Sequence, residues 1–129
     1  MTAPAPVPGW ARAEWAALLG LASALGIEHA REIHWAPFVA AFLAIDLVGY
    51  LPGAIAFHRA RRGPIASIYH HLYNVAHSLI TAAAAVIAWA IGGGGFEWAM
   101  LAIPIHLCGD RALFGNARKP VGFLFEAAS

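Results

Sequence analysis

Cysteine and charged residues are both scarce in this chain of 129 residues. Its one cysteine, Cys108, cannot form a disulfide within the chain and excludes a metal site built from several cysteines. Only 12% of the residues are charged, and a net charge of +1 provides no basic field for binding nucleic acid. The sequence has no glycine-rich phosphate loop, nucleophile elbow, HExxH motif or helix-turn-helix pattern. These absences argue against a nucleic-acid-binding protein and against the common classes of soluble enzyme.

Apolar residues make up 60% of the sequence, and its mean hydropathy is +0.65. Soluble domains contain roughly 45–50% apolar residues, and a chain this small cannot bury such an excess. The apolar residues fall into four blocks at about 10–27, 35–57, 65–91 and 96–114, and a membrane-spanning helix needs about 20 residues. The sequence therefore predicts an all-α, integral-membrane four-helix bundle, with a disordered proline-rich lead at 1–9 and a tail at 115–129.

The distribution of basic residues predicts the orientation of this bundle. Basic side chains gather between the second and third blocks and after the fourth, at Arg59, Arg61, Arg62, Arg111, Arg118 and Lys119. Because cytoplasmic loops carry an excess of Lys and Arg, we expect both termini and the tail to be cytoplasmic. As an alternative, the first block is a signal peptide, since Ala22-Ser23-Ala24 resembles a cleavage site.

Several ionisable residues lie inside the predicted spans, where each would cost several kcal/mol unless paired or hydrated. Helix geometry places Asp46 roughly 18 Å and His77 roughly 15 Å from the inner ends of their helices. His106 and Asp110 are four residues apart and share one side of the fourth block. Glu14 lies near the start of the first block. Alternating helix directions would bring these side chains to related depths.

Histidine and carboxylate side chains are ligands that suit zinc, manganese or iron. The sequence therefore predicts a divalent-metal site, with zinc as the first choice, whose ligands are Asp46, His77, His106 and Asp110. Helical spacing places further polar groups on the His77 face, and the additional ligands or hydrogen-bonding supports that we expect are Glu14, Asn74 and His70. Alternatively, the same residues form salt bridges and hydrogen bonds that only fix helix packing.

Four segments resemble the motifs of a bacterial family of small uncharacterised membrane proteins, the domain of unknown function 4260. In chain order they run from Asp46 to Tyr50, from Tyr73 to Ser78, from His106 to Leu113 and from Lys119 to Phe123. This resemblance implies a multi-pass protein of the bacterial inner membrane and carries no activity. A fainter likeness, in His77-Ser78 and in His106 with Asp110, is to predicted membrane-bound metal-dependent hydrolases.

The leading functional hypothesis is a membrane-embedded divalent-metal site that hydrolyses lipid-like substrates. It implies the lipid bilayer, a lipid-like substrate and a homo-oligomer as partners, and no catalytic residue is assigned. Alternative hypotheses are an ion- or proton-conducting or transport bundle, and an accessory membrane subunit with a structural polar cluster. A further alternative is haem held by paired histidines.

Overall fold

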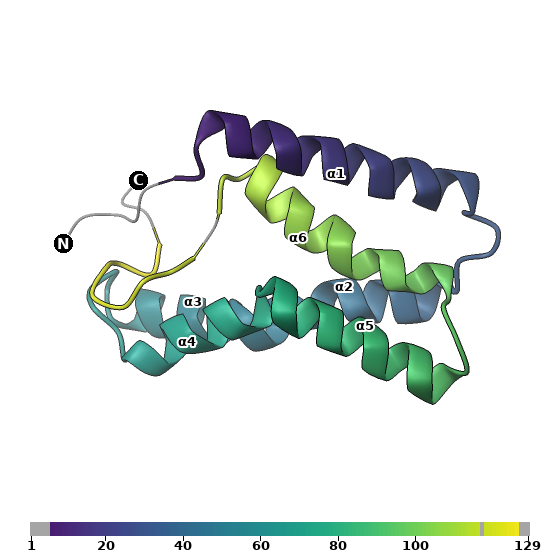
Figure 1. Cartoon of the computed structure of the whole chain (residues 1–129). Coiled ribbons are helices and arrows are strands. Elements are labelled where there is room, and N and C mark those ends of the chain that lie inside the picture. Colours follow the sequence, from purple (N-terminus) through teal and green to yellow (C-terminus); the bar gives the residue numbers. More distant parts are fainter. Residues whose placement is uncertain (1–5, 117, 127–129) are drawn as a thin grey trace. The chain divides into compact units, whose positions relative to one another are not determined.

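The computed structural model describes residues 6–116 and 118–126, and helices account for all of their regular secondary structure (Figure 1). The helices are α1 (Gly9–Glu28), α2 (Trp35–Gly49), α3 (Leu51–Arg59), α4 (Ser67–Ala76), α5 (Leu79–Gly93), the 3-10 helix η1 (Trp98–Leu101) and α6 (Ala102–Ala112). The prediction of an all-α fold is confirmed for these residues. Of the predicted lead, residues 1–5 lie outside the described residues, and the amide of Val7 donates to the carbonyl of Gly115.

One described helix is by itself long and apolar enough to cross a membrane. It is the run Trp35–Arg59, which joins α2 and α3 over 25 residues. The most apolar stretch of 18 residues in this run has a mean hydropathy of 1.9. The pair α4 and α5 adds a second candidate if its two helices, bent by 54°, count as one broken span. The four-span arrangement therefore stays a prediction, because α1 carries Arg12 and Glu14 and α6 has only 11 residues.

The break between α4 and α5 divides the block at 65–91, which the sequence indicated as a single helix. The carbonyl of Tyr73 accepts both the backbone N–H of His77 and its ring Nδ1–H, while the amide of Ser78 bonds to Val75, three residues earlier. Side chains that compete for helical carbonyls in this way bend helices. The break therefore arises at the residue whose ring the sequence singles out as a ligand.

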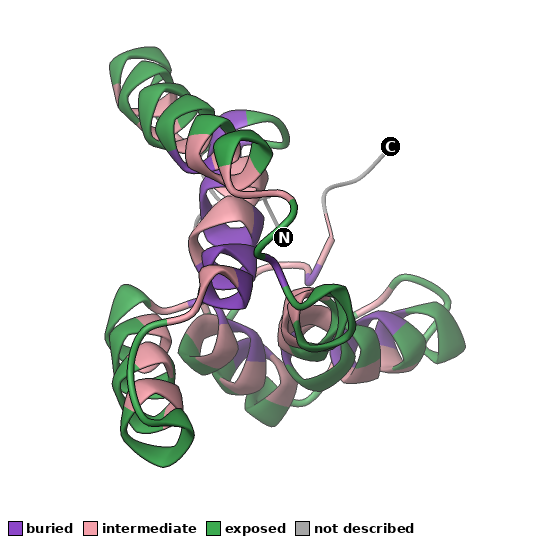
Figure 2. Ribbon diagram, turned by 90° about the vertical axis from the view of Figure 1, so that its right-hand side faces the viewer, coloured by how far each residue is buried: buried purple, intermediate pink, exposed green. Residues whose placement is uncertain are grey.

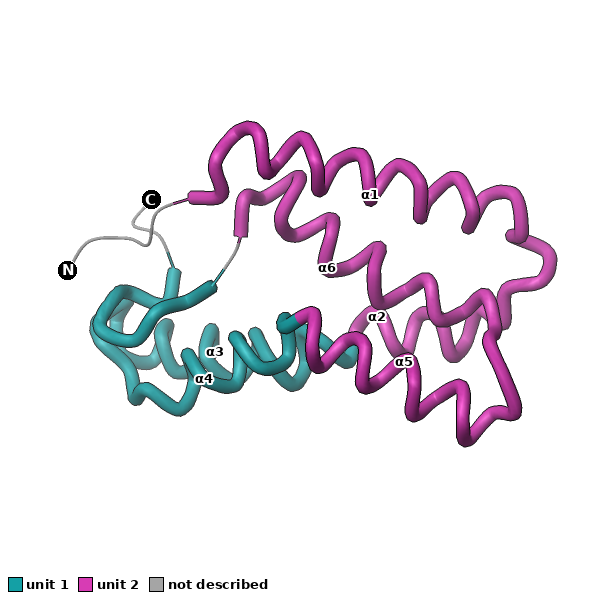
Figure 3. The backbone as a smooth tube through the Cα atoms, viewed as in Figure 1, with its two compact units in different colours: residues 1–5, 44–78, 118–129 teal, residues 6–43, 79–117 magenta. Residues whose placement is uncertain are grey.

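The described chain divides into two compact units (Figure 3). The first unit comprises residues 44–78 and 118–126, and the second comprises residues 6–43 and 79–116. The core of the first unit consists of Ala54, Phe57, Tyr73 and Phe125, so the C-terminal segment 118–126 contributes a buried ring to it. We refer to this segment as the tail segment.

In the second unit, α1 packs along α6, and buried residues concentrate in η1 and α6 (Figure 2). The Arg12 guanidinium donates to the carbonyl oxygens of Ala112 and Leu113, which satisfies acceptors that the end of α6 leaves without helical partners. A cation at a helix C-terminus is also favoured by the helix dipole. Arg12 therefore joins the start of α1 to the end of α6.

The loops at the opposite end of the second unit are joined by aromatic and polar contacts. The His29 ring stacks on Trp98 at 3.7 Å, and the Trp98 indole donates to Glu32. The hydrogen bond from His29 holds the pKa of the Glu32 carboxyl below its usual value. A second pair, His34 and Glu97, links the same two loops at 2.9 Å.

Docking of the tail segment depends on a glycine in α3. A Cβ atom at Gly53 would lie 2.2 Å from Cζ of the buried Phe125 ring. We predict that Gly53→Ala displaces the tail segment and lowers the free energy of unfolding by about 1–3 kcal/mol, the usual cost of overpacking. Thermal unfolding of the purified protein would measure this change.

The matched control is Gly20→Ala in α1, where a Cβ atom would meet nothing within 4 Å. Because alanine favours a helix interior over glycine, this variant should be as stable as the parent or more stable. Equal stability of the Gly53→Ala variant and the parent would contradict the docking described here.

Candidate metal centre

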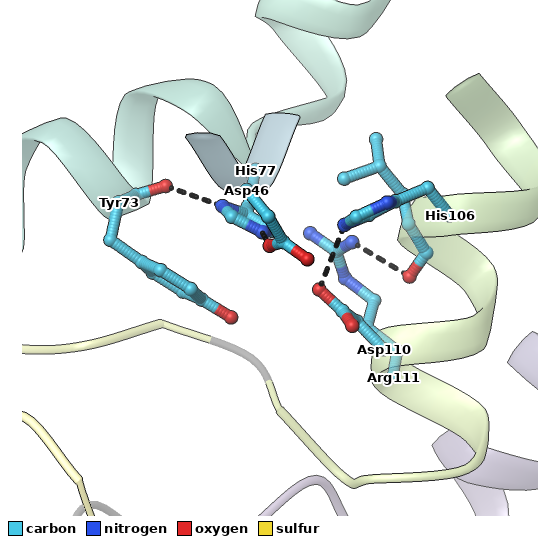
Figure 4. Close-up of polar contacts among 7 residues, drawn as sticks. Asp46, Tyr73, His77, His106, Asp110 and Arg111 are labelled. Atoms are coloured by element: carbon cyan, nitrogen blue, oxygen red, sulfur yellow. Dashed lines mark hydrogen bonds and ion pairs between the residues drawn. The ribbon is translucent and has the colours of Figure 1, made fainter. Parts of the chain in front are cut away.

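The first unit contains a buried histidine that faces a carboxylate. The side chain of His77 is only 3% exposed, its Nδ1 lies 3.0 Å from the Tyr73 carbonyl, and its Nε2 lies 3.3 Å from Oδ1 of Asp46 (Figure 4). Because a carbonyl only accepts hydrogen bonds, Nδ1 carries the hydrogen. In the neutral ring Nε2 is then an acceptor facing an acceptor. A proton or a metal cation between Nε2 and the carboxylate resolves this conflict.

Packing fixes the orientation of the His77 ring. The Tyr73 ring stacks on it with a centroid distance of 3.9 Å and an interplanar angle of 16°. On the α2 side, a Cβ at Gly49 would lie 2.5 Å from Cβ of Ala76 and 3.1 Å from Nδ1 of His77. Only glycine therefore allows α2 to approach the end of α4 this closely. A backbone-bonded, immobilised imidazole is the arrangement that metal-binding histidines usually show.

The second unit contains a similar pair on one helix. His106 is 4% exposed, and its Nε2 lies 3.6 Å from Oδ2 of Asp110, one turn later in α6 (Figure 4). The Phe42 ring packs edge-on against the imidazole at a centroid distance of 4.7 Å. The neighbouring Arg111 turns back along α6 to donate to the Leu107 carbonyl. The sequence spacing of four residues was sufficient to predict this pair.

The spacing within each pair is longer than an ordinary hydrogen bond. The two N···O distances are 3.3 and 3.6 Å, whereas N–H···O bonds usually measure about 2.7–3.2 Å. Two ligands on a tetrahedral zinc, each about 2.1 Å from the metal, lie roughly 3.4 Å apart. Each pair is thus an ion pair whose spacing is also close to that of two zinc ligands. Each unit thus contributes one His/Asp pair, and these four side chains are of the types that could hold a metal ion.

The structure places the three supporting residues elsewhere in their units. The Asn74 amide bonds to the backbone of Lys119 twice, donating at 3.0 Å and accepting at 2.7 Å. Nε2 of His70 lies 3.1 Å from the Phe123 carbonyl. Both residues therefore hold the tail segment. Glu14 lies on the exposed side of α1.

An aromatic cage around Lys119 was not foreseen from the sequence. The Lys119 ammonium lies 4.5 Å from the centroid of the Phe125 ring, 4.8 Å from that of Tyr73 and 5.7 Å from that of Tyr50. Such cation–π contacts are worth about 0.5–2 kcal/mol each. The same Tyr73 ring stacks on His77, so the tail segment supports the histidine through this tyrosine. The sequence signal for this cage was Lys119-Pro120 followed by the aromatic residues Phe123 and Phe125.

Comparison with known proteins returned no matching family model, curated protein or solved structure. The resemblance to the domain of unknown function 4260 therefore stays a prediction.

Because Asn74 bonds to the tail segment, we predict that Asn74→Leu releases that segment and leaves metal binding intact. The Lys119 amide would lose its acceptor, at a cost of about 1–3 kcal/mol. Trypsin cleavage after Arg118 should become faster, while the metal content of the purified protein stays at the parent level.

Asn116→Leu is the matched control, since Asn116 is exposed and its amide side chain contacts no tail residue among those described. The prediction would be contradicted if the Asn74→Leu protein kept its tail segment docked but lost its metal. That result would place Asn74 among the ligands.

Proposed function

We propose that this chain is a multi-pass protein of the bacterial inner membrane that binds one zinc ion and hydrolyses lipid-like esters. The proposed ligands are His77, His106 and Asp110, with Asp46 as a fourth ligand or as the base beside a zinc-bound water. The observation that carries the proposal is the His77 ring. One of its nitrogens donates to a backbone carbonyl, and the other faces a carboxylate at 3.3 Å.

The donor set favours zinc over the other divalent metals. Imidazole and carboxylate ligands suit zinc, and two histidines with one carboxylate form a known class of catalytic zinc site that keeps one position for water. Calcium and magnesium prefer sites made of oxygen ligands alone. A bound zinc ion would lower the pKa of its water to about 7 and polarise an ester oxygen.

Exposure separates the two carboxylates. The Asp46 side chain is 47% exposed, whereas that of Asp110 is 17% exposed. Asp46 is therefore the carboxylate that water reaches more easily, and we assign it the role of general base. It takes the proton of the attacking water and returns it to the alkoxide oxygen that leaves when the acyl–oxygen bond breaks.

The apolar surface supports a membrane location. α5 has no buried residue, and large apolar side chains such as Ile27, Ile80 and Ile91 are 79–83% exposed. Apolar surface left in water costs roughly 25 cal/mol per Å², and extended patches of it mark membrane or protein contacts. A bilayer would cover these side chains, and the predicted homo-oligomer would cover part of the same surface. Basic residues at 59–62 support a cytoplasmic position for that loop.

Elemental analysis of the detergent-purified protein tests this proposal. We predict about one zinc per chain, lost in His77→Ala and in His106→Ala, because each removes a nitrogen ligand. Asp46→Asn should keep the metal and lower ester hydrolysis by about 10²–10⁴-fold, the usual contribution of a general base.

The matched control is His71→Ala, because His71 is an exposed histidine on the helix that precedes His77. Its metal content should equal that of the parent. Zinc that persists in both ligand variants would contradict the site. An Asp46→Asn variant that hydrolyses esters normally but no longer carries protons into liposomes would favour the transport alternative.

A further inference from the structure

An open apolar groove runs between α1, α5 and α6 of the second unit. It has a volume of about 600 Å³, within the range of roughly 300–1,000 Å³ that is typical of small-molecule sites. Its lining is apolar apart from the indole nitrogen of Trp15 and the thiol of Cys108, and it includes Leu18, Leu25, Val86, Leu101, Ile103 and Leu107. Such a lining favours an occupant that presents an apolar chain.

The length of the groove matches half of a bilayer. Its α1 wall extends from Trp15 to Leu25, which spans about 15 Å at 1.5 Å per residue. The hydrocarbon core of a bilayer is about 30 Å thick, so one leaflet contributes about 15 Å. Leu18 and Leu79 line the groove and are 49% and 53% exposed, so a chain in the leaflet can enter from the side.

Positive charge lies at one end of the groove. The Arg111 guanidinium lies 4.8 Å from the ring centroid of Trp15, which lines the groove at that end. Arg12 precedes Trp15 by three residues and so lies on the same side of α1. The Arg12 guanidinium donates to carbonyl oxygens, which do not neutralise its positive charge. No carboxylate among the described residues forms an ion pair with Arg12. An apolar groove with the Arg12 cation at one end fits an anionic amphiphile.

We propose that this groove binds one acyl chain of an anionic phospholipid of the cytoplasmic leaflet, whose phosphate contacts Arg12. Basic pockets on the cytoplasmic side of membrane helices bind anionic headgroups in this way. The same helix, α6, carries His106 and Asp110, so such a lipid is also the substrate class of the proposed zinc site. Lipid binding rests on the membrane location proposed above, and only this last step rests on the zinc site.

Photo-crosslinking in vesicles tests the acyl-chain site. The protein is stripped of metal with EDTA and reconstituted in phosphatidylcholine that contains a trace of phosphatidylglycerol with a diazirine on one acyl chain. We expect cross-links to α1, α5 and α6. Ala83→Phe places a ring where the acyl chain would lie and should lower their yield about tenfold, which corresponds to about 1.4 kcal/mol of binding free energy. Ala85→Phe, an exposed alanine of α5 outside the lining, should match the parent.

Competition tests the headgroup site. Unlabelled phosphatidylglycerol should displace the probe at a lower mole fraction than added phosphatidylcholine does. Arg12→Gln should weaken this preference, and Arg12→Lys, which keeps the charge, should retain it.

Three outcomes would overturn the proposal. They are equal cross-linking of the two phenylalanine variants, equal competition by the two lipids in the parent, and chain-to-chain cross-links that Ala83→Phe removes. The last would show that a second copy occupies the groove. Because the protein is free of metal throughout, failure of the zinc site leaves these results unchanged.

Discussion

An imidazole whose Nδ1–H is held by a backbone carbonyl can face a carboxylate at close range only when a proton or a metal cation lies between them. His77 is in this position, between the Tyr73 carbonyl and Asp46. The local fold serves this ring: its bond to Tyr73 ends α4, Gly49 lets α2 approach it, and Tyr73 stacks on it. The ring is 3% exposed while the carboxylate is 47% exposed, and this pairing of a buried imidazole with a carboxylate open to water is why we assign it a function.

The tail segment adds a second layer of support to the same ring. Lys119 lies among three aromatic rings, one of them Tyr73, and Phe125 occupies the space that Gly53 leaves. A residue near the C-terminus thereby restrains a tyrosine that restrains His77. The bond to the Tyr73 carbonyl holds the ring independently of the tail segment, so the ring stays oriented when that segment is released.

The apolar blocks predicted where the helices lie, because polar and glycine-rich segments separate the blocks at the loops. The spacing of four residues predicted the His106–Asp110 pair, because such residues lie on one side of a helix. The break at His77 was not predicted, because it arises from competition for one carbonyl. The Lys119 cage was not predicted either, because its rings come from positions 50, 73 and 125, and no periodicity links them. Asn74 and His70 share the His77 face, yet their hydrogen bonds are to the tail segment.

X-ray absorption at the zinc edge tests the central claim most directly, since it reports the atoms bound to the metal in the purified protein. The account predicts a four-coordinate shell of nitrogen and oxygen at about 2.0–2.2 Å, with the outer-shell scattering of two imidazoles. A sulfur ligand at about 2.3 Å, which would indicate Cys108, or a shell without imidazole would contradict it.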